Sequence, residues 1–449
     1  MEKGFIFDYA KCVGCHACMV ACYAENSTQP PLSWRQVNTF NGKKIPGHGF
    51  LHQSLACNHC LDAPCLKACP AVAYTRDSVT GAVIHHAERC IGCKYCTWAC
   101  PFDTPKFNIS KGVVEKCNFC NSRLKDGGIP ACAELCPTGA LSFGPITIER
   151  SVGNIGLSYQ PIRPQLNTLR DEVSNSVPQM DTAATTSLPM DDVAKLLVEP
   201  SHKIHSFDEW PLVLFTFIAS AMSGWLAAQL IEGALPVNRW VFGFLIAIGA
   251  MLSTFHLGKP FRAARALLHV RTSWLSREIL LFGLFSVLSL TYLFISSHNV
   301  WLIASVFVAV LMLGAIEMVY SVTTKAYSTP LHSANTILTA LAFGAIFASA
   351  TNIVVVTLAA KAILYLLRKA NVRTMSAMYS LTSLVRFILG CFVPMVVFAF
   401  GHSHYYWAAL ASFTLGELID RFDYYNDLRV ETPTHNLYKS LLSRLRRGR

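Results

Sequence analysis

The sequence predicts an α+β protein in two parts: a small head of short strands and helices at residues 1–150, and an all-α bundle of eight transmembrane helices at residues 207–425. Two observations predict this architecture. Sixteen of the 17 cysteines lie between Cys12 and Cys136, and apolar runs repeat from Pro211 onwards. In addition, only 14% of the residues are charged, which is unusual for a chain that is soluble throughout.

The cysteines of the head fall into four groups of four. The groups are Cys12, Cys15, Cys18 and Cys22; Cys57, Cys60, Cys65 and Cys69; Cys90, Cys93, Cys96 and Cys100; and Cys117, Cys120, Cys132 and Cys136. Four thiolates hold one [4Fe–4S] cluster, so these thiols suffice for four clusters. The first group resembles the third and the second resembles the fourth, which indicates a duplicated, bacterial-ferredoxin-like unit. The sequence therefore predicts a chain of clusters that carries single electrons.

The spacing within the groups is typical of cubane ligands. In the first and third groups, C-x-x-C-x-x-C wraps three cysteines around one cluster, and the fourth cysteine follows on a helix. In two-cluster ferredoxins that fourth cysteine binds the other cluster. A strand is expected at residues 4–9 and a helix at residues 19–26, on either side of the first loop. Gly14 and Gly92 let the backbone approach inorganic sulfur.

Other uses of the cysteines fit the pattern less well. Structural zinc sites pair C-x-x-C knuckles, and a [3Fe–4S] cluster is expected only where the second cysteine of a group is missing. Disulfides fit poorly because C-x-x-C holds its thiols too close for ordinary disulfide loops, and residues 1–8 are too short for an export signal. Clusters with a purely structural role are the remaining alternative, which redox titration tests.

Eight apolar runs follow a linker and precede a basic tail. Residues 151–206 hold five prolines with Ser- and Thr-rich stretches, which predicts a flexible linker, and residues 426–449 form a basic tail. Each run is long enough, or nearly so, to cross a bilayer. The predicted spans are residues 211–231, 240–257, 278–296, 300–320, 332–350, 352–368, 382–401 and 405–420.

The charges predict the orientation of these spans. The formal net charge is +11, and four oxidised clusters with their thiolates offset about 8 of it, so nucleic acid is not a predicted partner. Sixteen Lys and Arg residues fall in the loops and tail on the side of the head, against Arg239 on the other side. By the positive-inside rule, the head faces the cytoplasm from a multi-pass cytoplasmic membrane protein.

A candidate quinone site lies where the second span ends and the third begins. His256 and Glu278 are expected near the head's face of the membrane, with Lys259, Arg262 and Arg277 around them. Quinone chemistry moves two protons with two electrons, so it needs titratable groups close to a cluster. The alternative is a basic loop, residues 259–277, that binds lipid headgroups.

Other ionisable residues fall within the spans. Most lie near predicted span ends, where their side chains could snorkel to the interface, and Glu417 is the one of greatest functional interest. Cys391 is interpreted as a small apolar residue, and no haem is expected because no two histidines lie deep in different spans. The ionisable residues are Glu317, Lys361, Arg386, Glu417 and Asp420.

Both halves resemble one known family. Residues 1–145 resemble the four-cluster iron–sulfur subunit of the dimethyl-sulfoxide reductase family of molybdenum enzymes, and residues 207–425 resemble its eight-helix membrane anchor. The head motifs carry the first resemblance. The second is carried by Glu-Trp-Pro-Leu (209–212), His-Leu-Gly-x-Pro-x-Arg (256–262), Ser-Trp-Leu-Ser-Arg-Glu-Ile (273–279) and Gly-Glu-Leu-Ile (416–419). The family usually has these subunits as two chains, which are fused here.

The resemblance implies how the cysteines share clusters. Three cysteines of one group would bind with the fourth cysteine of another. The implied ligand sets are Cys12, Cys15 and Cys18 with Cys136; Cys117, Cys120 and Cys132 with Cys22; Cys57, Cys60 and Cys65 with Cys100; and Cys90, Cys93 and Cys96 with Cys69, the last nearest the membrane.

The resemblance also implies menaquinone or ubiquinone at His256 and a separate catalytic subunit that carries molybdopterin. The chain itself would not be catalytic for the terminal substrate, and its partners would be that subunit, quinone and membrane lipid. Two directions of electron flow stay open: from quinol to an oxidised substrate, or from substrate to quinone as in a cytoplasm-facing relative, the membrane-bound sulfite dehydrogenase. An ion-translocating redox module is the alternative from another functional class.

Overall fold

The computed structural model describes residues 3–28, 30–40, 51–146, 166–169, 204–321, 331–372, 381–400, 406–428 and 432. The chain divides into two compact units. The first, which we call the head unit, is Met1–Ser201 with Glu431–Arg449. The second, which we call the membrane unit, is His202–Val430. Each unit is described here by itself.

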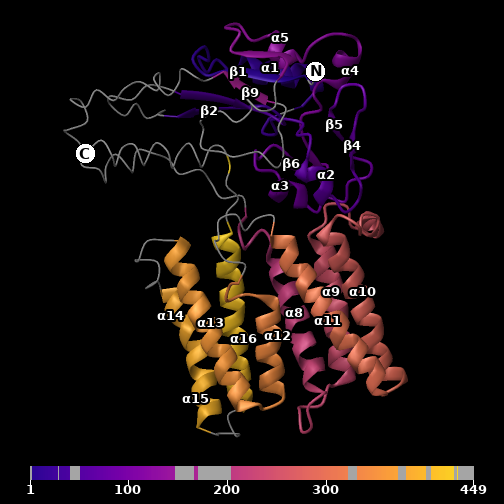
Figure 1. The fold of residues 1–449 in the computed structure, drawn as a ribbon, viewed down its shortest axis with the longest axis vertical. Helices are drawn as coiled ribbons and strands as arrows, with labels where there is room; N and C mark the ends of the chain where they lie inside the picture. Colours follow the sequence, from indigo (N-terminus) through magenta and orange to yellow (C-terminus); the bar gives the residue numbers. More distant parts are fainter. Residues whose placement is uncertain are drawn as a thin grey trace, which may run out of the picture. The chain divides into compact units, whose positions relative to one another are not determined.

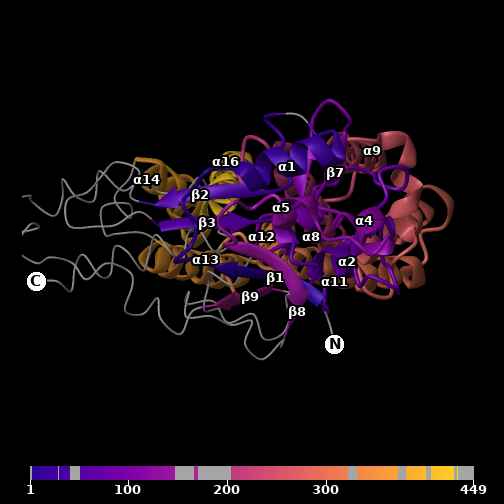
Figure 2. The ribbon, with the colours of Figure 1, turned by 90° about the horizontal axis from the view of Figure 1, so that it is seen from above.

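The head unit is built from short antiparallel strand pairs. In Figure 2, β8 (Leu141–Pro145), β1 (Lys3–Asp8) and β9 (Leu166–Leu169) lie side by side, with β1 in the middle of the sheet. The predicted strand at residues 4–9 is confirmed by β1. The remaining strands form three hairpins: β2 (Gln36–Phe40) with β3 (Leu51–Leu55), β4 (Tyr74–Arg76) with β5 (Val83–His85), and β6 (Lys106–Asn108) with β7 (Val113–Glu115).

Strand β9 differs from the flexible linker that the sequence predicts. It pairs parallel with β1, with Leu166 opposite Phe5, while β8 pairs antiparallel with the other edge of β1. The physical reason is that β1 has backbone donors and acceptors on both edges, and a second strand satisfies those that β8 leaves open. Apart from β9 and residues 204–206, the predicted linker lies outside the described residues.

Each cysteine-rich loop of the head leads into a short helix. The predicted helix at residues 19–26 is confirmed by α1 (Ala17–Asn26). The others are α2 (Pro64–Ala68), α3 (Tyr95–Ala99), α4 (Asn121–Lys125) and α5 (Ala131–Glu134). Short helices suit this position because the cysteines, rather than a long apolar face, fix the surrounding chain.

The membrane unit is a bundle of roughly parallel and antiparallel helices (Figure 1). Its helices are α8 (Trp210–Ala228), α9 (Arg239–Phe255), α10 (Trp274–Leu290), α11 (Asn299–Tyr320), α12 (Thr336–Phe347), α13 (Thr351–Val372), α14 (Leu381–Phe387), α15 (Val393–Ala399) and α16 (Tyr406–Asp427). The side chains of Asn238 and Asn335 cap α9 and α12 by accepting hydrogen bonds from backbone N–H groups. The π-helical segments Thr291–Ile295 and Ile388–Phe392 continue α10 and join α14 to α15.

Four helical segments of the described chain are long and apolar enough to cross a membrane. They are Trp210–Ala228, Trp274–Ile295, Asn299–Tyr320 and Leu381–Ala399. A fifth results if α9 and the 3-10 helix Pro260–Leu267, which bend by 99° at their junction, count as one span. Helices occur at all eight predicted positions, but α12 is only 12 residues long, and α13 and α16 carry several charged residues.

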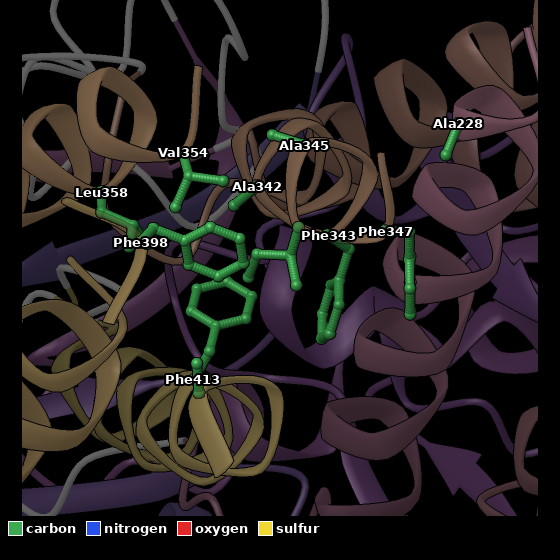
Figure 3. Packing of buried hydrophobic residues seen from close by; sticks show 11 residues of the cluster. Ala228, Ala342, Phe343, Ala345, Phe347, Val354, Leu358, Phe398 and Phe413 are labelled. Atoms are coloured by element: carbon green, nitrogen blue, oxygen red, sulfur yellow. The ribbon is translucent and has the colours of Figure 1, made fainter. Parts of the chain in front are cut away.

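Close packing of small residues and aromatic rings holds the bundle together. A Cβ added at Gly416 of α16 would lie 2.2 Å from the Gly390 backbone, so these two segments touch through glycine. Figure 3 shows an aromatic cluster in which Phe343 of α12 meets Phe413 of α16, with ring centroids 4.9 Å apart. Phe398 of α15 joins the same cluster.

Candidate metal centres and membrane site

Cysteines from different groups of the head lie near one another in the structure, as the four ligand sets that the resemblance implies would require. We call them the first set (Cys12, Cys15, Cys18, Cys136), the second set (Cys22, Cys117, Cys120, Cys132), the third set (Cys57, Cys60, Cys65, Cys100) and the fourth set (Cys69, Cys90, Cys93, Cys96). Burial chiefly raises the pKa of Cys12, and its neighbouring thiolates are those of Cys18, Cys136 and Cys15, all in the first set.

The other sets are recognised in the same way. Burial raises the pKa of Cys22 to about 12, with Cys132 and Cys120 as neighbouring thiolates. In the third set, burial raises the pKa of Cys60, whose neighbouring thiolates are Cys57, Cys100 and Cys65. In the fourth set, burial raises the pKa of Cys96, whose neighbouring thiolates are Cys93, Cys69 and Cys90. Crowded buried thiols of this kind suit a metal centre, which favours the thiolate form.

The four sets follow one another in a line. Cys18 of the first set has Cys132 of the second set among its neighbouring thiolates. Cys117 of the second set packs against Cys57 of the third set in one buried cluster. Tyr74 connects the third and fourth sets, because its buried hydroxyl lies near both Cys65 and Cys96. The line therefore begins at the first set and ends at the fourth.

Among the described residues, which include all sixteen head cysteines, no group of three or more His, Cys, Asp or Glu residues lies close enough to hold a single metal ion.

Left-handed backbone positions recur in the loops of the first and third cysteine groups. Gly14 and Gly92 have φ of 68° and 72°, and His16 and Lys94, which follow the next cysteine, have φ of 63° and 58°. Backbone N–H groups turn toward sulfur in these loops, as where Gly92 N lies 3.4 Å from Cys90 Sγ. The repeated positive φ values show that the two loops have the same local fold.

The second and fourth cysteine groups repeat in the same manner. His59 and Phe119 follow an asparagine in equivalent loops, and both have positive φ values, of 43° and 66°. Their rings stack on each other with centroids 4.1 Å apart. The equivalent loops therefore meet at the centre of the head.

Two buried cations lie between the sets, and the sequence alone did not point to them. Arg35 is only 2% exposed and lies at the boundary of the first and second sets; its Nη1 donates to Ser54 Oγ over 2.9 Å. Burial alone would lower the pKa of Arg35, but the thiolates of Cys132, Cys18, Cys117 and Cys22 raise it. No spacing signal in the sequence marks Arg35.

Lys116 lies at the next boundary, between the second and third sets. It is 3% exposed, and its Nζ donates to the carbonyl oxygens of Val83 and Cys117. Burial alone would lower the pKa of Lys116, but the thiolates of Cys57, Cys65 and Cys117 raise it. Its position beside Cys117 was the only available sequence signal.

In the membrane unit, His256 and Glu278 lie at the ends of adjacent helices. His256 is the C-cap of α9, and Glu278 lies near the start of α10, in its second turn, where it is 5% exposed. The 3-10 helix Pro260–Leu267 contacts both α9 and α10, so the intervening chain folds back over the ends of both helices. His256 and Glu278 thus lie at the joined ends of α9 and α10.

The basic residues of this loop have different roles. Arg277 donates to the carbonyl oxygens of Val270 and Arg271 over 2.9 and 2.5 Å, and it lies 4.1 Å above the Trp274 ring. Arg277 therefore fixes the loop. Lys259 precedes the 3-10 helix that contains Arg262, and both side chains are partly exposed.

Two tyrosines near Glu278 were not identified from the sequence. Tyr320 ends α11 and Tyr425 lies in the last turn of α16, and their hydroxyl groups hydrogen-bond to each other. The Glu278 carboxyl group is close enough to interact electrostatically with both. Nearby, His332 Nε2 lies 3.0 Å from Glu317 Oε2, and the His332 ring stacks on Tyr424.

The expectation that the other ionisable residues snorkel is wrong for four of them. Lys361 and Glu417 form a buried ion pair of 3.0 Å, and Asp420 pairs with both Arg386 and Arg368 at 2.5 and 2.9 Å. These side chains are at most 2% exposed. Opposite charges on α13, α14 and α16 satisfy one another, so none needs to reach the interface.

Cys391 also differs from its interpretation as a plain apolar residue. Its Sγ lies 3.1 Å from Arg386 Nη1, which donates to it inside the bundle. The network continues to α8, where Arg421 donates to the hydroxyls of Thr216 and Ser220 over 2.9 and 3.0 Å. The sequence offered only the charges, without their partners.

Both halves of the chain match known protein families. Residues 49–146 match a 4Fe-4S dicluster domain, and residues 204–395 match the DMSO reductase anchor subunit. A subunit of the anaerobic dimethyl sulfoxide reductase of Haemophilus influenzae is 37% identical over 172 residues, which cover 83% of that protein and 36% of this chain. The protein belongs to the dimethyl sulfoxide reductase family. It joins an iron–sulfur electron-transfer part to a membrane anchor in one polypeptide.

Further members of the family give the same result. A subunit of the anaerobic dimethyl sulfoxide reductase of Escherichia coli is 38% identical over 153 residues, covering 74% of that protein and 32% of this chain. The thiosulfate reductase electron transfer subunit of Salmonella typhi is 41% identical over 155 residues, covering 80% of that protein and 33% of this chain. This member of the dimethyl sulfoxide reductase family is thus an iron–sulfur membrane protein with an electron-transfer and anchoring role.

Proposed function

We propose that the chain relays electrons between a membrane quinone and a separate catalytic subunit that carries molybdopterin. The four cysteine sets hold four [4Fe–4S] clusters, and quinone or quinol is bound at His256 and Glu278. The single observation that carries this proposal is the linear order of the sets in the head. A line of redox centres has two ends, and each end needs an electron donor or acceptor.

The quinone end is supported by the chemistry of the α9–α10 junction. Oxidation of one quinol releases two electrons and two protons, so the site needs groups that accept protons. His256 and Glu278 supply an imidazole and a carboxyl group, and the hydroxyls of Tyr320 and Tyr425 lie nearby. Lys259 and Arg262 belong to the same proposed site, whereas Arg277 orders the loop around it.

The catalytic end is supported by the relatives. The proteins from Haemophilus influenzae and Escherichia coli are single subunits of dimethyl sulfoxide reductases, and such subunits act together with others. A subunit that provides the terminal substrate site would contact the head near the first set. The eight helical positions and the excess of basic residues support an eight-span anchor in the cytoplasmic membrane, with the head in the cytoplasm.

The quinone assignment is tested with His256→Ala. Quinol added to the purified chain should no longer reduce the clusters, while iron content and reduction by dithionite stay unchanged. His298→Ala is the matched control, because His298 precedes α11, at the far end of α10 from Glu278. Normal quinol-driven cluster reduction in the His256 variant would contradict the assignment.

The number and type of clusters are tested separately. Iron and acid-labile sulfide analysis should give four cubanes per chain, and electron paramagnetic resonance should detect all of them on stepwise reduction. A strong [3Fe–4S] signal in the oxidised intact protein, or zinc in place of iron, would refute the four-cluster proposal. Clusters that do not reduce reversibly would favour the structural-scaffold alternative.

The ion-translocating alternative is favoured by one observation, the charged network of α13, α14 and α16. The network occupies the C-terminal half of α16, from Glu417 to Asp427. The N-terminal half of α16 packs instead into the apolar cluster of Ala409 and Phe413. A path for ions across the bundle would have to pass this cluster, so we retain the electron relay. Proton uptake by vesicles during turnover distinguishes the two.

A further inference from the structure

Arg35 and Lys116 have an unusual electrostatic environment for buried cations. Neither has a carboxylate within ion-pair distance in the part of the chain that the structure describes. A buried charge without a counter-charge is strongly destabilising. The groups that surround them are the thiols of two neighbouring cysteine sets in each case.

The hydrogen bonding of Arg35 leaves room for a further negative group. Nη1 donates to Ser54 Oγ, and that hydroxyl also lies 3.5 Å from Cys18 Sγ. The Nε and Nη2 atoms are buried without an oxygen or nitrogen acceptor among the described residues, and the guanidinium interacts with the Cys132 thiol. The guanidinium also stacks on the Phe5 ring at 4.4 Å, which fixes its position. The buried Nε and Nη2 groups of Arg35 can therefore donate hydrogen bonds to sulfur acceptors.

The ammonium group of Lys116 is also fixed in position by its contacts. Two backbone carbonyl oxygens bind its ammonium group, and the Tyr74 ring centroid lies 5.9 Å away. The ammonium group is adjacent to the sulfur atoms of Cys57 and Cys65 in the third set and of Cys117 in the second. Each cation thus serves two sets, and the second set adjoins both.

We propose that Arg35 and Lys116 are fixed charges that raise the reduction potentials of the clusters beside them, those of the first and second sets for Arg35 and those of the second and third sets for Lys116. The inference rests on the proposed four-cluster function. One-electron reduction takes a [4Fe–4S]²⁺ centre to [4Fe–4S]⁺ and adds one negative charge to its thiolate-ligated site. Adding that charge is costly away from water, and a cation held beside the cluster offsets the cost. The two residues are positioning residues, because their fixed charges keep the neighbouring clusters reducible.

The test is a redox titration of the full chain, with dithionite as reductant, followed by electron paramagnetic resonance. Arg35→Met should lower the potentials of two centres, and Lys116→Met should also lower two, with one centre common to both variants. We expect at least a tenfold fall in the equilibrium constant for reduction, which is about 59 mV for one electron. Arg35→Lys and Lys116→Arg, which keep the charge, should restore most of the shift.

Lys111→Met is the matched control. Lys111 is an exposed lysine, with a side chain 65% exposed, that pairs with Glu115 on the surface of the same hairpin region, so its loss should leave all potentials unchanged. Unshifted potentials in either Met variant with normal iron content would overturn the proposal. Loss of iron in both variants would also overturn it, because the residues would then be structural supports. Fewer than four centres in the unaltered chain would instead refute the proposed function.

Discussion

At the scale of single residues, backbone conformation decides where the cysteines can gather. Gly14 has a φ of 68°, and a Cβ at this position would lie 2.4 Å from the His52 ring. Glycine is therefore needed at position 14 for two reasons: the backbone is left-handed, and the His52 ring approaches closely. The sequence suggested glycine here for contact with inorganic sulfur, and the structure adds a protein neighbour.

We predict that Gly14→Ala destabilises the head more than Gly127→Ala. Both glycines have positive φ, but nothing lies within 4 Å of a Cβ at Gly127. Gly127→Ala should cost about 1–2 kcal/mol from backbone strain alone, whereas Gly14→Ala adds the clash with His52. Urea unfolding followed by the loss of cluster absorbance measures the difference. Equal midpoints for the two variants would contradict the argument.

At the scale of elements, α16 connects most of the second half of the bundle. Its Asp420 binds Arg386 of α14 and Arg368 of α13, while Gly416 touches the π-helical segment between α14 and α15. Close backbone approach and buried ion pairs thus act on the same helix. In the Gly-Glu-Leu-Ile motif, Gly416 is explained by this close packing and Glu417 by its ion pair with Lys361.

We predict that Gly416→Ala severely destabilises the bundle. The added methyl would lie 2.2 Å from the Gly390 backbone, which must shift. Gly314→Ala in α11 is the control, because nothing lies within 4 Å of its Cβ and alanine favours the helix by about 0.5–1 kcal/mol. Thermal unfolding of the detergent-purified chain should show a large fall for the first variant and no fall for the second.

Removal of one partner from the buried ion pairs should also be costly. Asp420→Asn leaves Arg368 and Arg386 without a shared carboxylate, and we expect a loss of about 3–5 kcal/mol. Arg368 keeps its ion pairs with Asp423 and Asp427, so the charge left without a carboxylate is that of Arg386. Adding Arg386→Met to that variant removes this charge and should recover part of the stability. The same thermal assay applies, and a double variant less stable than the single variant would contradict this interpretation.

At the scale of the whole molecule, two units are stabilised by different forces. The head has short elements and relies on its cysteine sets, whereas the membrane unit is held by helix packing, aromatic clusters and buried charges. The proposed ligand sets draw cysteines from distant parts of the head, so cluster binding by these sets would be coupled to folding of the head.

We therefore predict that removal of iron unfolds the head and leaves the bundle intact. Treatment with ferricyanide and a chelator should abolish the unfolding transition of the head and expose its thiols to alkylation. The transition of the membrane unit should stay within a few degrees of that of the intact chain, as followed by calorimetry. A single transition that moves as a whole would show that the two units unfold together.

Local spacing and hydropathy were enough to predict strand β1, helix α1 and the positions of the helices, because each of these features is specified by neighbouring residues. The pairings between segments emerged from the folded structure alone. Folding brings Arg35 and Lys116 between the cysteine sets, Tyr320 and Tyr425 near Glu278, and Asp420 to Arg386. These partners are far apart along the polypeptide, and a contact between distant segments leaves no periodicity or spacing by which it could be predicted.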